Sequence, residues 1–140
     1  MTFRPTIHTQ QDLEDAWRHL MSPLGFSATS IWFMLIDADG HPFPHVTQIE
    51  DADQPPSPEE LAGLADVIKD LRDELVPGGR VAFLLGRPGG PAVSAADRAF
   101  ARALYDVADL SGVPVEVVHL ACDTDIVPLP MDEALPDSAA

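Results

Sequence analysis

The apolar residues of this chain follow two kinds of spacing, one typical of strands and one typical of helices. Two runs are apolar at every position, Ile31–Ile36 and Val81–Leu85, and both contain β-branched and aromatic side chains. Such runs are typical of strands that are buried on both faces of a sheet. Three shorter segments predict further strands, at His45–Ile49, Val115–Leu120 and Ile126–Leu129.

Three other segments have apolar residues at helical spacing, and each begins at a side chain that can cap a helix. The first is Thr9–Met21, with its first residue as the cap. The second begins at Ser57, and Glu60 can complete a capping box there. The third begins near Ser94 and ends near Gly112, a residue suited to a helix C-terminus. The apolar stripes are expected to bury Leu61, Leu64, Ala65, Ile68, Leu71 and Leu75 in the second helix and Phe100, Leu104, Val107 and Ala108 in the third.

The connecting segments indicate how these elements assemble. Asp37–Gly40 is a turn signal, so the next strand is expected to return antiparallel. Pro42 and Pro44 stand just before it and cannot donate ladder hydrogen bonds, which favours a short or edge strand. The strand-helix-strand unit Val81–Leu120 is expected to be parallel. The predicted fold class is therefore α/β: a three-layer sandwich in the order α-β-β-α-β-α-β-β, with helices covering a mixed central sheet of about five strands.

Composition and charge restrict the function classes. The chain has 140 residues, 46% of them hydrophobic, which predicts a single domain over residues 1–130 followed by an acidic flexible tail at 131–140. The formal net charge of −15 repels phosphate backbones and anionic lipids, so neither direct nucleic-acid binding nor membrane binding is expected. With one cysteine, no signal-peptide core and no membrane-length apolar run, we expect a cytoplasmic protein.

The glycine-rich loop after the strand Val81–Leu85 is the first candidate for chemistry. Phosphate loops present consecutive backbone N–H groups, but Pro88 and Pro91 remove two of these donors and no Gly-Lys-Ser/Thr follows. Arg87 is a candidate for anion binding, which Asp97 near the same helix start would oppose. The segment Ser94–Asp97 is typical of a helix cap, and the alternative makes Asp97 a metal ligand and Ser94 an oxyanion donor.

The histidines and the cysteine form no recognisable metal-ligand pattern. His41 and His45 are four residues apart, but the intervening prolines exclude the helix that would align them. His119 alternates with apolar residues, which favours a core histidine, although it stays a candidate for binding. Cys122 is expected to be buried as a small apolar residue. No metal and no cofactor are therefore expected.

Several of these residues together resemble the JAB/MPN metalloprotease-like domain, and within it the RadC-like branch. The family has a His-x-His-Pro motif after a strand, then Ser-x-x-Asp opening a helix, a Gly-Val/Ile turn, a strand ending near His-Leu/Ile, and a closing hairpin. The resemblance covers about Thr29 to Pro130. The matching positions are Pro88, Ser94-Ala95-Ala96-Asp97, Gly112-Val113, His119-Leu120 and Ile126–Leu129.

The departures from the family pattern concern its catalytic residues. The two motif histidines fall on Leu85 and Arg87, neither of which binds zinc, and Thr29 and Ser30 stand where the catalytic Glu is expected. Asp97 alone cannot hold a catalytic zinc, which needs three protein ligands. The resemblance therefore implies a degenerate, non-catalytic domain that acts by binding or scaffolding a protein partner or a second copy of itself as a homodimer. A cytidine-deaminase-like sandwich is a competitor, but its His/Cys-x-Glu and Pro-Cys-x-x-Cys motifs are absent.

Two alternatives from other function classes stay open. One is a hydrolase with an unconventional site around Arg87, Ser94, Asp97 and His119, which requires these four side chains to converge. The other is an acidic adaptor for a basic partner, which requires the carboxylates to be concentrated on one face. A homodimer through Trp17, Trp32 and the first apolar strand is a further hypothesis, although core packing explains these residues equally well.

Overall fold

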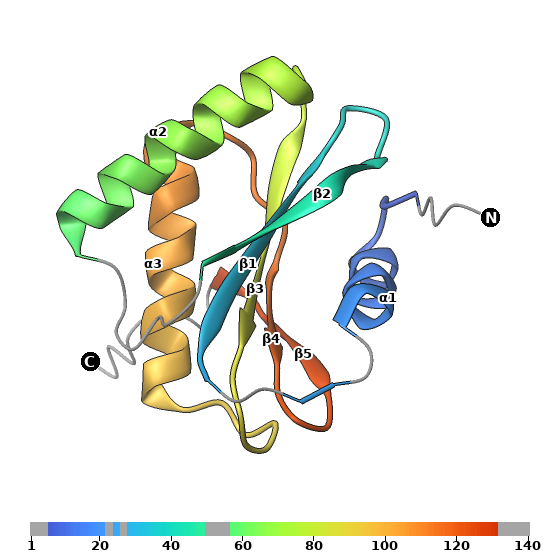
Figure 1. Cartoon of the computed structure of the whole chain (residues 1–140), viewed down its shortest axis with the longest axis vertical. Coiled ribbons are helices and arrows are strands. Elements are labelled where there is room, and N and C mark those ends of the chain that lie inside the picture. The colour runs from blue at the N-terminus through green and yellow to red at the C-terminus, as the bar shows by residue number, and fades with distance from the viewer. Residues whose placement is uncertain (1–5, 22–23, 26–27, 50–56, 132–140) are drawn as a thin grey trace.

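Within the residues that the computed structural model describes, 6–21, 24–25, 28–49 and 57–131, three helices and five strands follow each other in the predicted order (Figure 1). Beyond Met131, the predicted acidic tail lies outside the described residues. The elements are α1 (Gln10–Met21), β1 (Ser30–Ile36), β2 (Pro42–Ile49), α2 (Pro58–Leu75), β3 (Arg80–Gly86), α3 (Ala95–Ser111), β4 (Val118–Ala121) and β5 (Ile126–Leu129).

The strands form one mixed sheet in the order β2-β1-β3-β4-β5. β1 is antiparallel to both of its neighbours, β3 and β4 are parallel, and β5 returns antiparallel to β4. These pairings confirm the predicted hairpin and the predicted parallel strand-helix-strand unit. β2 is an edge strand, as the prolines indicate, but it already begins at Pro42. Both prolines thus lie inside the strand, because an edge strand has no partner on one side of its backbone.

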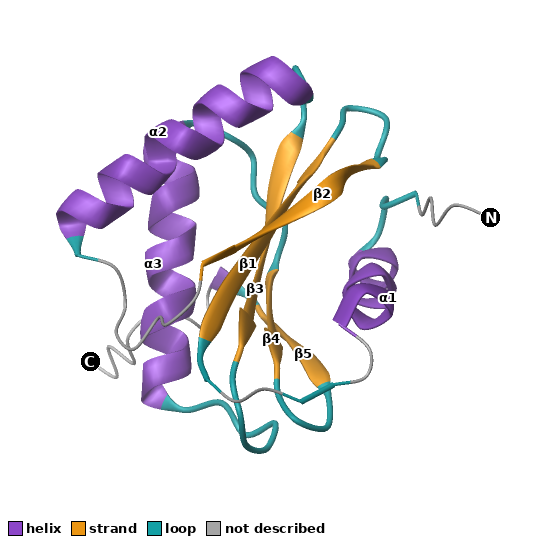
Figure 2. Ribbon diagram, viewed as in Figure 1, coloured by secondary structure: helices purple, strands orange, loops and turns teal. Residues whose placement is uncertain are grey.

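The helices cover both faces of this sheet, so the three-layer α/β sandwich is confirmed (Figure 2). On the face covered by α2 and α3, the rings of Phe33 and Phe83 meet edge to face with centroids 6.1 Å apart. On the face covered by α1, Trp17 packs with Met34 and Leu84. Each central strand is buried on both sides, which explains why its sequence is apolar at every position.

The predicted helix caps are present. Thr9 Oγ1 accepts a hydrogen bond from the Asp12 N–H at 3.1 Å, and Ser57 and Ser94 each form a capping box. Gly112 adopts the left-handed conformation, with φ of +73°, at the end of α3. None of the described helices is long and apolar enough to cross a membrane.

Two further expectations about boundaries and burial are wrong. The sequence predicts a strand from Val115, but β4 begins at Val118, because only an isolated bridge joins Val115 to Val81. The sequence also places Leu75 in the buried stripe of α2, but this side chain is 39% exposed. The helix ends at Leu75, and the following residue, Val76, occupies the buried position instead.

Candidate functional site

The glycine-rich loop lies at the carboxyl ends of the parallel strands β3 and β4, just before α3 begins. The Arg87 N–H donates to the carbonyl oxygen of Ala121 at 3.0 Å. Further along, the Gly89 N–H donates to the Asp123 carboxylate at 2.9 Å, and the Asp123 N–H donates back to the Gly89 carbonyl at 3.1 Å. The loop is therefore attached to the end of β4 and to the β4–β5 turn by hydrogen bonds, and two of its N–H groups are already used.

Arg87 directs its whole side chain into this loop. Its Nε and Nη2 atoms donate to the two carboxylate oxygens of Asp97 at 2.7 and 2.8 Å, a bidentate ion pair. Nη1 donates to the carbonyl oxygens of Pro88 and Gly90, and Nη2 donates also to that of Ala92. A guanidinium has five N–H donors, and these five bonds use all of them. The candidate anion-binding residue thus has no donor left for an anion.

Asp97 is the buried half of this pair and also part of the cap of α3. Its residue is 2% exposed, its carboxylate accepts from the Ser94 N–H at 2.9 Å, and its own N–H donates to Ser94 Oγ at 3.1 Å. Burial by itself raises the pKa of the Asp97 carboxyl, but the hydrogen bonds from Arg87 and Ser94 outweigh it, so the pKa lies below its ordinary value. The cap interpretation of Ser94–Asp97 is confirmed. From the sequence we expected Asp97 to oppose the binding of an anion at Arg87. In the structure the Asp97 carboxylate is itself the anion that Arg87 binds.

The other positions at the start of the resembling motif offer no ligand atoms. Leu85 is completely buried among the apolar side chains between the sheet and α3. Pro88 is exposed and contributes only its carbonyl oxygen, to Arg87. Neither side chain can hold a metal or a substrate by a polar bond.

His119 lies on the opposite face of the sheet from this cluster. Its neighbours Val118 and Leu120 belong to the core under α2 and α3, and side chains alternate along a strand, so His119 faces α1. The structure therefore brings together Arg87, Ser94 and Asp97, but not the fourth residue of the hydrolase alternative. His119 is completely buried, as expected of a core histidine, and burial lowers its pKa.

Three further residues considered from the sequence lie wholly or partly in the core. Trp17 is completely buried under the sheet, and Trp32 is partly buried on a strand that lies between β2 and β3. Core packing accounts for Trp17 fully and for Trp32 in part, and a homodimer through Trp32 and the first apolar strand stays a hypothesis. Cys122 is buried, as predicted, and its Sγ lies 3.4 Å from the Asp125 carbonyl oxygen.

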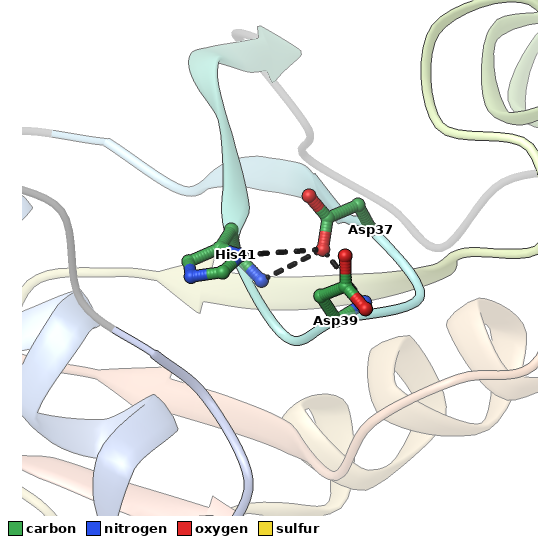
Figure 3. Close-up of side chains that lie close together, drawn as sticks. All are labelled: Asp37, Asp39 and His41. Carbon is green, nitrogen blue, oxygen red and sulfur yellow. Dashed lines mark hydrogen bonds and ion pairs between the residues drawn. The ribbon is translucent and has the colours of Figure 1, made fainter.

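One cluster of side chains that can ligate a metal was missed by the sequence analysis. Asp37, Asp39 and His41 lie in the turn between β1 and β2, with one ligand atom of each within 4.8 Å of the others (Figure 3). The Asp-x-Asp-x-His spacing is the signal that points to them. Asp37 Oδ1 already accepts hydrogen bonds from the N–H groups of Asp39 and His41, at 2.9 and 3.0 Å. The bond from the His41 N–H is the main reason that the pKa of Asp37 is lowered. These bonds are those of a turn that closes a hairpin.

No protein-family model matches this chain, and no curated protein matches it either.

Proposed function

We propose that this chain is a non-catalytic domain, similar to the RadC-like branch of the JAB/MPN domains, that acts by binding protein. The observation that carries the proposal is the closed arrangement of Arg87 and Asp97. The residues that stand at the first metal-ligand positions of the resembling motif are a buried leucine and an arginine whose five donors all bind the protein itself. The β3–α3–β4 unit and the closing β4–β5 hairpin agree with the same resemblance. A cytoplasmic location and the absence of direct nucleic-acid contacts are parts of this proposal.

The proposal predicts that zinc plays no part in the fold. Purified protein is expected to contain less than stoichiometric zinc, and neither a chelator nor added zinc should change the melting temperature, because Leu85 and Arg87 supply no ligand. Elemental analysis and thermal melts with and without EDTA measure this. A melting temperature that falls by several degrees with EDTA would contradict it. The double variant Asp39→Asn/His41→Gln is the control, because it shows whether any zinc effect originates in the β1–β2 turn.

The distribution of charge favours a scaffold over an acidic adaptor. Exposed carboxylates lie on α2, at Asp66 and Asp70, and also on α1 across the sheet, at Asp15. An adaptor for one basic surface requires its carboxylates on one face. The described carboxylates instead cover both outer layers of the sandwich.

The surface that best fits a partner is the edge of β2 that pairs with no described strand, and the partner that fits it is a second copy of this chain. Two copies, each with a net charge of −15, repel each other unless they meet at an uncharged surface. Residues 41–49 contain no Asp, Glu, Lys or Arg. Proteins commonly protect edge strands with such charges, particularly with Lys, or with proline, which here stands only within the first three residues of β2. Two β2 strands paired antiparallel about a twofold axis would join the two sheets into one.

Thr47→Lys tests this surface. Thr47 is exposed on β2 opposite Phe33 of β1, so the variant adds a cation to each of the two paired strands and is expected to weaken the dimer at least ~10-fold. Sedimentation velocity over a range of concentrations measures the dissociation constant. Ala62→Lys on the exposed side of α2 adds the same charge elsewhere and should leave the constant unchanged. A wild-type protein that stays monomeric at millimolar concentration would refute self-association through β2, whatever the outcome with zinc.

A further inference from the structure

The face of the sheet beneath α1 carries a row of side chains that contains a buried histidine. Trp32 of β1 is paired with Leu84 of β3, and Leu84 is paired with His119 of β4. Paired residues of neighbouring strands project from the same face. Leu84 packs in the same cluster as Trp17 of α1, so His119 also lies beneath this helix.

Burial and the unpaired Nε2 atom favour a neutral ring at His119. Its Nδ1 atom lies 3.0 Å from the carbonyl oxygen of Val117, which can only accept, so Nδ1 carries the hydrogen. Nε2 then carries the lone pair, and it is buried without a hydrogen-bond partner among the described residues. An unpaired nitrogen lone pair costs little compared with an unpaired N–H of a cation. The site is therefore compatible with neutral imidazole and unfavourable for the charged form.

Polar contacts among the described residues hold α1 near both of its ends. Arg18 Nη2 donates to Asp125 Oδ1 at 2.7 Å and to the Ile126 carbonyl oxygen at 3.4 Å. Before the helix, the Ile7 N–H donates to the Gly40 carbonyl oxygen at 2.7 Å. Between these contacts, the helix is held to the sheet by apolar burial. The buried side chains of α1 are Leu13, Ala16 and Trp17.

We propose that α1 is a cover that acid releases, because protonation of His119 detaches the helix from the sheet. The protonated ring would carry a hydrogen on Nε2 and would bury this N–H beside Leu84 without an acceptor. Moving α1 away is the least costly way to bring water to the ring, because α1 is a single helix and β4 is an inner strand. Release would expose the apolar face that contains Trp32, Met34 and Leu84.

The charged groups around His119 do not provide the missing acceptor. From α1, Glu14 acts on the ring electrostatically, but it makes no hydrogen bond to Nε2 and its carboxylate is paired with Arg18 at 3.1 Å. Glu116, which precedes β4, also acts on the ring electrostatically, and its carboxylate is paired with Arg80. The neighbouring strands β3 and β5 pair Leu84 and Pro128 with His119, and neither is charged.

The sign of the pH dependence follows from burial, which lowers the pKa of His119 below its ordinary value more than the Val117 carbonyl and the two glutamates raise it. The unfolded or released state therefore binds the proton more readily than the covered state. The covered state is fully stable above about pH 6.5 and loses stability as the pH falls from there towards the lowered pKa.

Tryptophan fluorescence between pH 7.5 and 4.5 tests the proposal, because both tryptophans of the chain, Trp17 and Trp32, lie in this interface. We expect a red shift on acidification while far-ultraviolet circular dichroism still shows the sheet. Protection factors from hydrogen exchange should fall in α1 before they fall in β3. His119→Gln cannot take up the proton, so its red shift is expected at a pH lower by about one unit or more.

His19→Gln is the matched control, because His19 is an exposed histidine on α1. It should show the wild-type transition. If wild type and His119→Gln have the same midpoint, the proposal is wrong. If His119→Gln does not fold, hydrogen exchange of the wild-type protein still tests the proposal. Simultaneous loss of protection in α1 and β3 on acidification would contradict the release of α1.

Discussion

Replacing Arg87 with Leu is expected to lower the free energy of unfolding by about 3–5 kcal/mol, the usual cost of leaving a buried charge without its partner. Asp97 is 2% exposed and receives two of its hydrogen bonds from Arg87. The same change frees the carbonyl oxygens of Pro88, Gly90 and Ala92, so the loop also loses its internal support. Urea denaturation of wild type and variant measures the difference.

Two controls separate the ion pair from a general effect of removing an arginine. Arg98 lies exposed on the first turn of α3, and Arg98→Leu should change stability by less than about 0.5 kcal/mol. In the double variant Arg87→Leu/Asp97→Asn no charge is left buried, so it should recover part of the loss. Equal effects of Arg87→Leu and Arg98→Leu would show that the buried pair contributes nothing specific.

The same pair predicts opposite pH dependences for wild type and variant. In wild type the pKa of Asp97 is lowered, so its contribution to stability is complete above the unfolded pKa of about 3.9 and is lost as the pH falls below it. In Arg87→Leu only burial and the cap remain, and burial raises the pKa of Asp97. The stability deficit of the variant should therefore shrink as the pH falls from 7 through the pKa of Asp97 in the folded variant towards the unfolded value of about 3.9.

Gly79→Ala is expected to lower the free energy of unfolding by about 1–3 kcal/mol, the usual cost of inserting an extra carbon atom into a well-packed core. A Cβ atom on Gly79 would lie 2.3 Å from the Ile36 carbonyl oxygen and 2.8 Å from that of Val76, so the backbone of β1 or of the turn must move. Gly63→Ala is the matched control. Gly63 is exposed within α2 with nothing within 4 Å of the added methyl, so this variant should gain about 0.5–1 kcal/mol. Urea denaturation that gives both changes the same sign would contradict the prediction.

Much of the fold could be predicted from the sequence because the relevant interactions are local. Ser57 and Ser94 start helices through hydrogen bonds to residues three positions away, and Gly112 ends one through its own backbone conformation. The runs Ile31–Ile36 and Val81–Leu85 are apolar throughout because both sides of a central strand are covered. These local signals determined the order of the elements and the three layers.

The features that the sequence predicted wrongly, or did not predict, depend on contacts with residues that are distant in the sequence. The fit of β2 with its prolines depends on its place at the sheet edge, and the exposure of Leu75 depends on where α2 leaves the core. Gly78 and Gly79 follow shortly after α2, and such a glycine pair is typical of the end of a helix. Only the tertiary structure shows that Gly78 supplies the positive φ and that Gly79 leaves room for a carbonyl oxygen of β1.

For the candidate site, the sequence by itself determined which chemistry was available, and the tertiary structure decided where each group was used. Side-chain types alone exclude Leu85 and Arg87 as zinc ligands. Whether Arg87 binds an anion or its own loop depends on carbonyl and carboxylate oxygens that only the folded loop brings within 3 Å. The face on which His119 lies depends likewise on strand register. A one-residue shift would move it to the other side of the sheet, beside α3 instead of α1.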